Sequence, residues 1–135
     1  KSEGMTEVVS VAAMMEEMGI STQPPLLGWA FSETTADEKS DAVRGFLDAS
    51  FAAKEMLLED DAAWEDLREL MNAETEAMFE QLREDYRDGI VTRYDAAVRD
   101  AAAQSFAIMA EYGGAELVGD RSTLPEGTFW NGYSR

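Results

Sequence analysis

The side chains that could carry chemistry in this 135-residue chain are mostly carboxylates. The sequence holds 28 Asp and Glu beside 11 Lys and Arg, with no Cys and no His. Without thiols and imidazoles, the chain cannot build Cys or His zinc sites, Ser-His-Asp triads, cysteine nucleophiles or histidine-ligated haem. The same absence excludes a di-iron bundle, which needs Glu-x-x-His pairs. Acid/base work by paired carboxylates and cation binding through oxygen remain to be considered.

Several carboxylates are spaced four residues apart, as at Glu65 and Glu69 or Glu76 and Glu80. On one helix face this spacing brings like charges together, which is destabilising. Catalysis would need burial or a charged partner that separates the two pKa values of such a pair. The pairs fall on the polar faces of predicted helices. We therefore expect a protein that is not an enzyme and has no catalytic residue.

Acidic runs that could hold a hard cation occur at residues 59–61 and at Glu84 and Asp85. No D-x-[DN]-x-[DN]-G loop frames either of them. Asp60 and Asp61 stand where the N-terminus of a helix favours negative charge. We expect these acids to cap and solvate helices, and we expect neither a metal nor a cofactor.

The apolar segment 26–32 (LLGWAFS) holds the candidate ligand-binding residues Gly28, Trp29 and Phe31. A continuous apolar run of this length predicts a buried strand. On a strand Trp29 and Phe31 would point to one face, because side chains alternate. A large aromatic beside a glycine can line a pocket. The alternative is a tryptophan that simply fills the core, where aromatic side chains are common.

The elements that must position these residues are mainly helical. Segment 6–11 is rich in β-branched residues and predicts a short strand, and 12–18 predicts a short helix ended by Gly19. Apolar residues then recur at helical spacing, and four amphipathic helices are predicted at about 40–58, 61–72, 74–87 and 92–113. The predicted fold class is mainly α (α+β): four to five amphipathic helices packed together with one or two short strands.

Helix ends and the C-terminal tail can also be predicted. Ser40 is a plausible N-cap, and Thr92 with Asp95 matches a capping box for the last helix. The pair Gly113 and Gly114 should end that helix. The tail from residue 115 is rich in turn-forming residues and is expected to be irregular. Its aromatic side chains are expected to anchor the C-terminus to the rest of the protein: Phe129, Trp130 and Tyr133.

The charge of the chain limits its partners. Its formal net charge is -17, so phosphate backbones and anionic membrane surfaces would repel it, and no nucleic acid partner is expected. Residues 59–88 alone carry 12 acidic and 3 basic side chains, a net of -9. Charge on exposed helix faces of this kind serves solubility.

Four stretches in order resemble one known family. They lie at 25–33 (PLLGWAFSE), 42–50 (AVRGFLDAS), 102–114 (AAQSFAIMAEYGG) and 124–130 (LPEGTFW). This order resembles the C-terminal part of substrate-binding proteins of bacterial ABC importers of the nitrate/sulfonate/taurine type. The resemblance implies a bilobal receptor with ligand held between its lobes. In that family a strand like 26–32 crosses between the lobes.

The resemblance also implies the setting in which the protein works. It implies a small-molecule ligand, an ABC permease as partner and a periplasmic or extracellular location, although no signal peptide is recognised in this chain. Residues 1–135 would form a single domain, a C-terminal half of the receptor. The alternative function is a stand-alone helical interaction module that forms a homodimer through exposed apolar surface.

Overall fold

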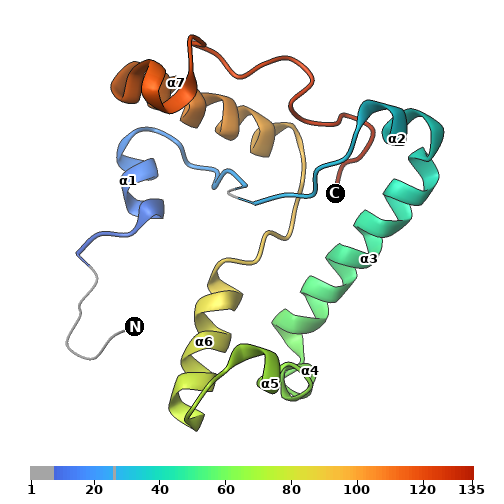
Figure 1. Cartoon of the computed structure of the whole chain (residues 1–135). Coiled ribbons are helices and arrows are strands. Elements are labelled where there is room, and N and C mark those ends of the chain that lie inside the picture. The colour runs from blue at the N-terminus through green and yellow to red at the C-terminus, as the bar shows by residue number, and fades with distance from the viewer. Residues whose placement is uncertain (1–7, 26) are drawn as a thin grey trace. The chain divides into compact units, whose positions relative to one another are not determined.

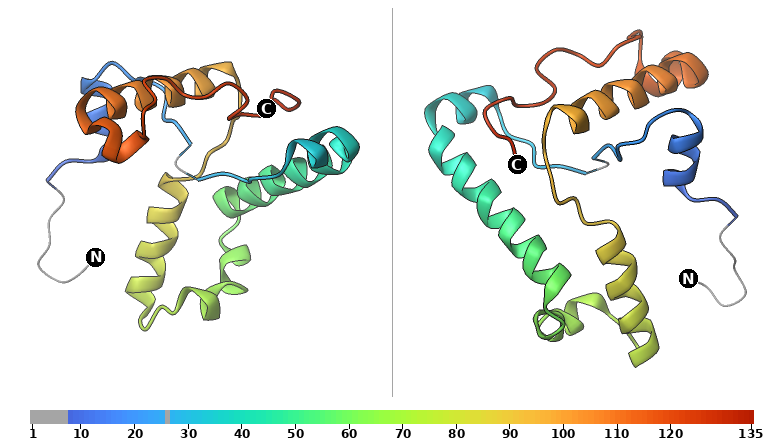
Figure 2. Two further views of the ribbon diagram at one scale, coloured as in Figure 1. Left: turned by 45° about the horizontal axis from the view of Figure 1, so that its top comes forward. Right: turned by 180° about the vertical axis from the view of Figure 1, so that it is seen from behind.

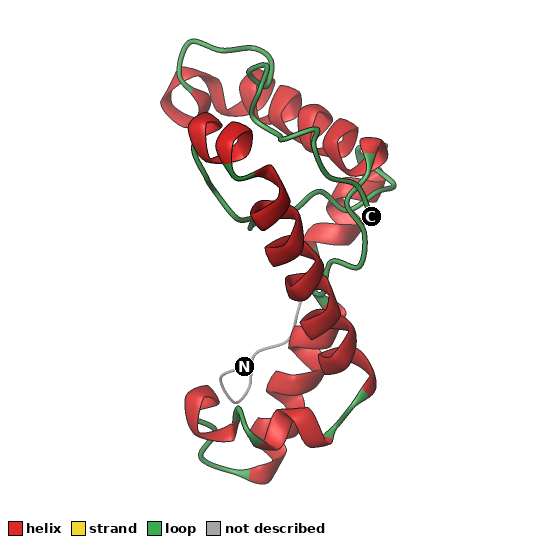
Figure 3. Cartoon of the chain, turned by 90° about the vertical axis from the view of Figure 1, so that its right-hand side faces the viewer, coloured by secondary structure: helices red, strands yellow, loops and turns green. Residues whose placement is uncertain are grey.

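The computed structural model describes residues 8–25 and 27–135 (Figure 1). These residues form seven helices, and none of them belongs to a strand (Figure 3). The chain divides into two compact units. Unit 1 takes in the chain up to Trp29 together with Tyr94–Asn131, and unit 2 consists of Ala30–Arg93 and Gly132–Arg135. The helical part of the predicted fold class is confirmed.

The predicted strands are the main error. In segment 26–32, Leu26 lies outside the described residues and 27–32 have no regular structure. In segment 6–11, residues 6 and 7 lie outside the described residues, 8–10 are irregular and Val11 begins a helix. A strand needs a neighbour to pair with its N–H and C=O groups. The described part of the chain provides no such neighbour, so an apolar run does not become a strand.

Helix α1 (Val11–Glu17) belongs to unit 1. The Ser10 hydroxyl caps it by accepting a hydrogen bond from the Ala13 amide at 3.1 Å. Gly19 follows with a φ of 81°, a conformation that favours glycine at the end of a helix. The predicted helix at 12–18 and its glycine stop are confirmed.

The long helix α7 (Ala96–Val118) also belongs to unit 1. Its N-cap is Asp95, whose Oδ1 accepts from the Val98 amide at 3.0 Å. The predicted capping box was therefore misplaced by three residues, since Thr92 precedes the helix. Gly114, with a φ of 63° and a ψ of -166°, breaks the helix near its end. The predicted stop at the glycine pair is seen as this break.

Unit 2 begins with α2 (Glu33–Glu38), which sequence analysis missed. Ser32 caps it by accepting from the Thr35 amide at 3.1 Å. The serine assigned to the end of a strand is therefore the start of a helix. Helix α3 (Ser40–Glu59) follows, and Ser40 is its first residue rather than its cap.

The rest of unit 2 is a helical hairpin. Helix α3 forms one arm of it, and the other members are α4 (Ala62–Glu65), α5 (Arg68–Met71) and α6 (Glu76–Asp88). Figure 2 shows that the two short helices connect the end of α3 to the start of α6, so the chain enters this corner along α3 and leaves it along α6. One helix was predicted for 61–72, and the structure has two short ones.

The C-terminal residues 132–135 pack on α3 inside unit 2, and we call them the C-terminal strap. The Tyr133 ring stacks on the buried Phe51 with 6.0 Å between centroids, and its hydroxyl donates to Asp48 at 2.8 Å. Arg44 Nε donates to the Gly132 carbonyl at 2.9 Å. The predicted anchoring role of Tyr133 is confirmed. In unit 1 the Tyr94 hydroxyl donates to the Trp130 carbonyl at 3.1 Å.

A search for membrane-spanning segments covered the described helices. None of them combines the length and the apolar content that crossing a bilayer requires.

Candidate functional site

The predicted ligand-binding residues lie in the irregular segment between α1 and α2. Trp29 is 62% exposed and Phe31 36% exposed, next to Leu27 at 92%. The boundary between the units falls after Trp29, so Trp29 belongs to unit 1 and Phe31 to unit 2. Because the segment is not a strand, alternation no longer places the two rings on one face. Their role in binding a ligand stays a prediction.

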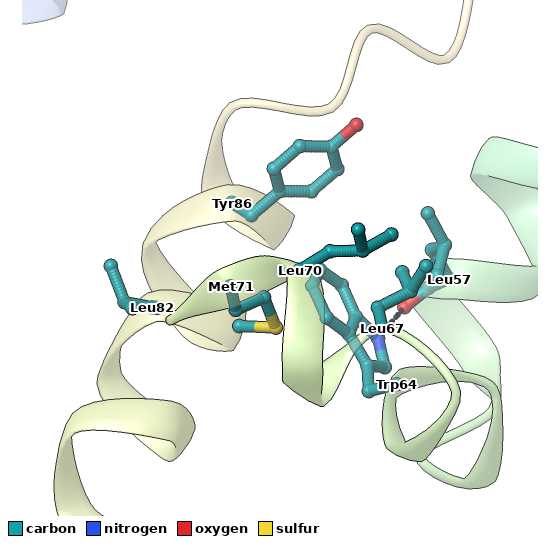
Figure 4. A pocket seen from close by; sticks show the side chains of 7 residues that line it. All are labelled: Leu57, Trp64, Leu67, Leu70, Met71, Leu82 and Tyr86. Atoms are coloured by element: carbon teal, nitrogen blue, oxygen red, sulfur yellow. Dashed lines mark hydrogen bonds between the residues drawn. The ribbon is translucent and has the colours of Figure 1, made fainter. Parts of the chain in front are cut away.

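Two neighbouring pockets lie in unit 2, at the corner of the helical hairpin. The first has a volume of about 310 Å³ (Figure 4). Its lining comes from α3, the α4–α5 corner and α6, and is apolar apart from one phenol: Leu57, Trp64, Leu67, Leu70, Met71, Leu82 and Tyr86. Amphipathic helices were predicted over the ranges that hold these residues, but the sequence did not bring the residues together, because the corner between α3 and α6 was not predicted.

Trp64 is the buried wall of this pocket, at 2% exposure. Its indole Nε1 donates to the Leu57 carbonyl at 2.8 Å (Figure 4). The Tyr86 ring meets it edge-on, with 5.4 Å between centroids and 77° between planes. A tryptophan is buried well when its N–H finds an acceptor and its ring meets another aromatic edge. These contacts tie α4 to both α3 and α6.

Arg87 on α6 reinforces the same corner. Its Nε donates to the Leu57 carbonyl at 2.9 Å, so that one oxygen accepts from two side chains. Its Nη2 lies 2.7 Å from Asp61 Oδ1, and its guanidinium carbon lies 5.7 Å from the Trp64 ring. The hydrogen bond from Arg87 lowers the pKa of Asp61 below its usual value, against a smaller opposing effect of desolvation. Asp61 is thus a structural acid that joins the α3–α4 turn to α6.

Arg68 on α5 forms a second clasp. It donates to both oxygens of Glu65, at 2.9 and 3.1 Å, and to both oxygens of Glu76, at 2.8 and 3.2 Å. Its guanidinium lies 3.8 Å from the ring of the buried Phe79. Hydrogen bonding to Arg68 lowers the pKa of both glutamates. Planar two-point contacts of this kind are specific to arginine.

The second pocket adjoins the first and has a volume of about 580 Å³. It shares Leu57 and Leu67 with the first pocket. The rest of its lining is apolar except for two carboxylates: Ala53, Met56, Asp60, Ala62, Ala63 and Asp66. Asp60 Oδ1 accepts from the Ala62 amide, the first amide of α4, at 2.8 Å, although the N-cap of this helix is Asp61, whose side chain forms no cap.

The acidic side chains do not gather into a metal site in the part of the chain that is described. No set of three or more potential metal ligands occurs among those residues, and none of their charged side chains is fully buried. Glu65 and Glu76 each bind Arg68 instead of pairing with Glu69 and Glu80. What the hairpin corner can do chemically is bind: it offers apolar surface, one phenol hydroxyl and two carboxylates.

The sequence was also compared with known proteins. No family model matches the chain, and no curated protein matches it. The resemblance to substrate-binding proteins of ABC importers therefore rests on the motifs of the sequence alone.

Proposed function

We propose that this chain is the solute-binding component, or the C-terminal fragment of one, of an ABC-type import system for a small molecule. In this role it is not catalytic, works outside the cytoplasm and delivers its ligand to a permease. The four ordered motifs support the proposal, because they come in the order found in the C-terminal part of such receptors.

The observation that carries the proposal is the exposure of segment 27–31. Leu27 and Trp29 are largely exposed side chains in a stretch whose composition is typical of a protein interior. Around Gly28 the space is open, since a Cβ placed there would meet no atom within 4 Å. Exposed apolar side chains beside an accessible backbone are what a ligand or a further segment of a receptor would cover.

Tryptophan fluorescence tests this proposal directly. The chain has three tryptophans, and Trp64 is buried within unit 2. We expect a small anion, amine or sulfonate from a panel to change the emission of the wild type. The matched variants Trp29→Phe and Trp130→Phe identify the reporter: the change should persist in Trp130→Phe and vanish in Trp29→Phe.

Two results would count against the proposal. One is a fluorescence change that persists in Trp29→Phe, which would place any ligand elsewhere. The other is the absence of any response to the panel in the longest natural form of the protein that contains this chain. The longest natural form is used for this test because a ligand held between two lobes contacts both of them.

A second candidate function is self-association as a helical interaction module. The apolar side chains that α7 leaves exposed favour it, above all Tyr112 at 79% and Leu117 at 61%. Size-exclusion chromatography with light scattering tests it. We expect a dimer that the double variant Tyr112→Ser with Leu117→Gln converts to a monomer, and a wild-type monomer at all concentrations would refute it.

A further inference from the structure

The two pockets at the hairpin corner form one surface feature. They share Leu57 and Leu67, so the apolar lining continues from Tyr86 on α6 to Met56 on α3. We call this feature the corner groove. One part of it is apolar, and the other part is apolar with Asp60 and Asp66 in its lining.

The lining of the corner groove is not covered within unit 2. Leu70 is 76% exposed, Met56 52% and Tyr86 53%, although all three line the groove. Figure 4 shows Leu70 and Tyr86 among the side chains that line the pocket together with Trp64. When a partner removes apolar side chains of this kind from water, the free energy of the complex falls.

The charges around the groove indicate which charge a partner should carry. Residues 59–88 carry 12 acidic side chains and only 3 arginines. Ion pairs inside unit 2 already occupy those arginines: Arg68 pairs with Glu65 and Glu76, and Arg83 and Arg87 pair with Asp61 and Glu84.

Asp60 and Asp66 differ from those paired acids. Within residues 8–25 and 27–135 neither has a basic partner, so the groove presents uncompensated negative charge. A cationic partner would be attracted to it. At this groove, the same acidic surface of a second copy, residues 59–88 with a net charge of -9, would be repelled.

We propose that the corner groove binds a basic amphipathic helix of a partner protein. The apolar face of that helix, with side chains at i, i+3, i+4 and i+7, fills the pocket beside Trp64 and Leu70. Lysine or arginine on its flank faces Asp60 and Asp66. The proposal is independent of the proposed solute-binding role, because segment 27–31 lines neither pocket.

Two labelled peptides test the proposal on the full chain. Both are roughly 14 residues long, about four helical turns, and share the same leucine face. One carries lysines on its polar face, the other glutamates. By fluorescence anisotropy at about 0.1 M salt, we expect the lysine peptide to bind at least tenfold more tightly. At about 1 M salt, where the screening length shrinks to about 3 Å, this preference should largely disappear.

Variants locate the binding surface. Leu70→Gln should weaken binding of the lysine peptide by about tenfold, because it places an amide at the exposed mouth of the groove. Its control is Met18→Gln, a half-exposed apolar residue at the end of α1 in unit 1, which should bind as the wild type does. Far-UV circular dichroism of both variants should match the wild type, since both sites are exposed.

The charge contribution has its own pair of variants. Asp60→Asn with Asp66→Asn should weaken binding several-fold at low salt and have no effect at high salt. Asparagine retains the oxygen that accepts from the Ala62 amide, so this hydrogen bond is kept. The control, Asp37→Asn with Glu38→Gln on α2, removes the same charge from unit 2 outside the groove and should change binding little.

Three results would overturn the proposal. The first is equal binding of the lysine and glutamate peptides at low salt. The second is an equal loss of binding in Met18→Gln and Leu70→Gln. The third is a wild-type dimer that Leu70→Gln dissociates, because the groove would then be covered by a second copy.

Discussion

The carbonyl oxygen of Leu57 gives the sharpest test of how the hairpin corner is held together. It accepts from Trp64 Nε1 at 2.8 Å and from Arg87 Nε at 2.9 Å. Removing one donor therefore leaves the other in place. Removing both leaves a half-buried carbonyl without a protein donor. The variants Trp64→Phe, Arg87→Met and their combination separate these cases.

The magnitudes follow from the contacts. Trp64→Phe loses one hydrogen bond, worth about 1 kcal/mol, and part of a buried ring, worth roughly another. Arg87→Met loses its hydrogen bond to the same oxygen, worth about 1 kcal/mol, together with its pairing with the exposed Asp61. The double variant adds the penalty of an unsatisfied acceptor, about 1 kcal/mol because Leu57 is only half-buried. We therefore expect destabilisation beyond additivity by about that amount.

Urea and thermal unfolding followed by circular dichroism measure these changes. For a unit of this size, each kcal/mol lowers Tm by roughly 4–8 °C, so Trp64→Phe should lower it by about 8–16 °C. Trp29→Phe is the matched control, since that ring is mostly exposed, and should change stability by less than about 0.5 kcal/mol. If the effects of Trp64→Phe and Arg87→Met add within about 0.4 kcal/mol, the shared acceptor is not what couples them.

Three further outcomes are expected. Hydrogen bonds from Arg68 and Arg87 lower the pKa of their carboxylate partners. The stability that these hydrogen bonds provide is therefore present above about pH 4.5 and is lost as the pH falls. Arg68→Met should weaken this dependence of Tm on pH. Tyr133→Phe should cost about 1 kcal/mol in urea unfolding, because it removes the hydroxyl that bonds to α3. Gly114→Ala should destabilise the protein by about 1–3 kcal/mol, because alanine is strained at that backbone conformation. Gly45→Ala inside α3 should stabilise it by about 0.5–1 kcal/mol. If both variants change stability in the same direction, the backbone argument is wrong.

Helices could be predicted where a cap, a stripe and a stop agree. For α6, apolar residues at helical spacing predicted a helix at about 74–87; the structure has Glu76–Asp88, with Phe79 buried and Gly89 at the C-cap. The N-cap of α7 was placed three residues early, because Thr92 and Asp95 match a capping box but Asp95 is itself the cap. A residue pattern alone does not tell which of two capping side chains binds the backbone.

Sequence alone could not show that 26–32 is not a strand, because an apolar run does not indicate whether a partner strand is available. The corner groove was missed for a related reason. Its lining comes from three segments, and Trp64 and Tyr86 meet only because the chain turns twice between them. The left-handed Asn72, with a φ of 50°, is the local feature that marks one of those turns. Asparagine tolerates this conformation better than most residues, so it was a signal that sequence reasoning could have used.

The C-terminal strap also bears on the order in which the protein is completed during synthesis. Tyr133 binds α3 across 85 positions of sequence, so the ribosome must add all of those residues before the contact can form. At a synthesis rate of about 5–20 residues per second, the aromatic face around Phe51 waits roughly 4–17 seconds for its cover. During that interval a newly made unit 2 presents Phe51 to chaperones and to neighbouring nascent chains, and the synthesis of residues 132–135 ends this exposure.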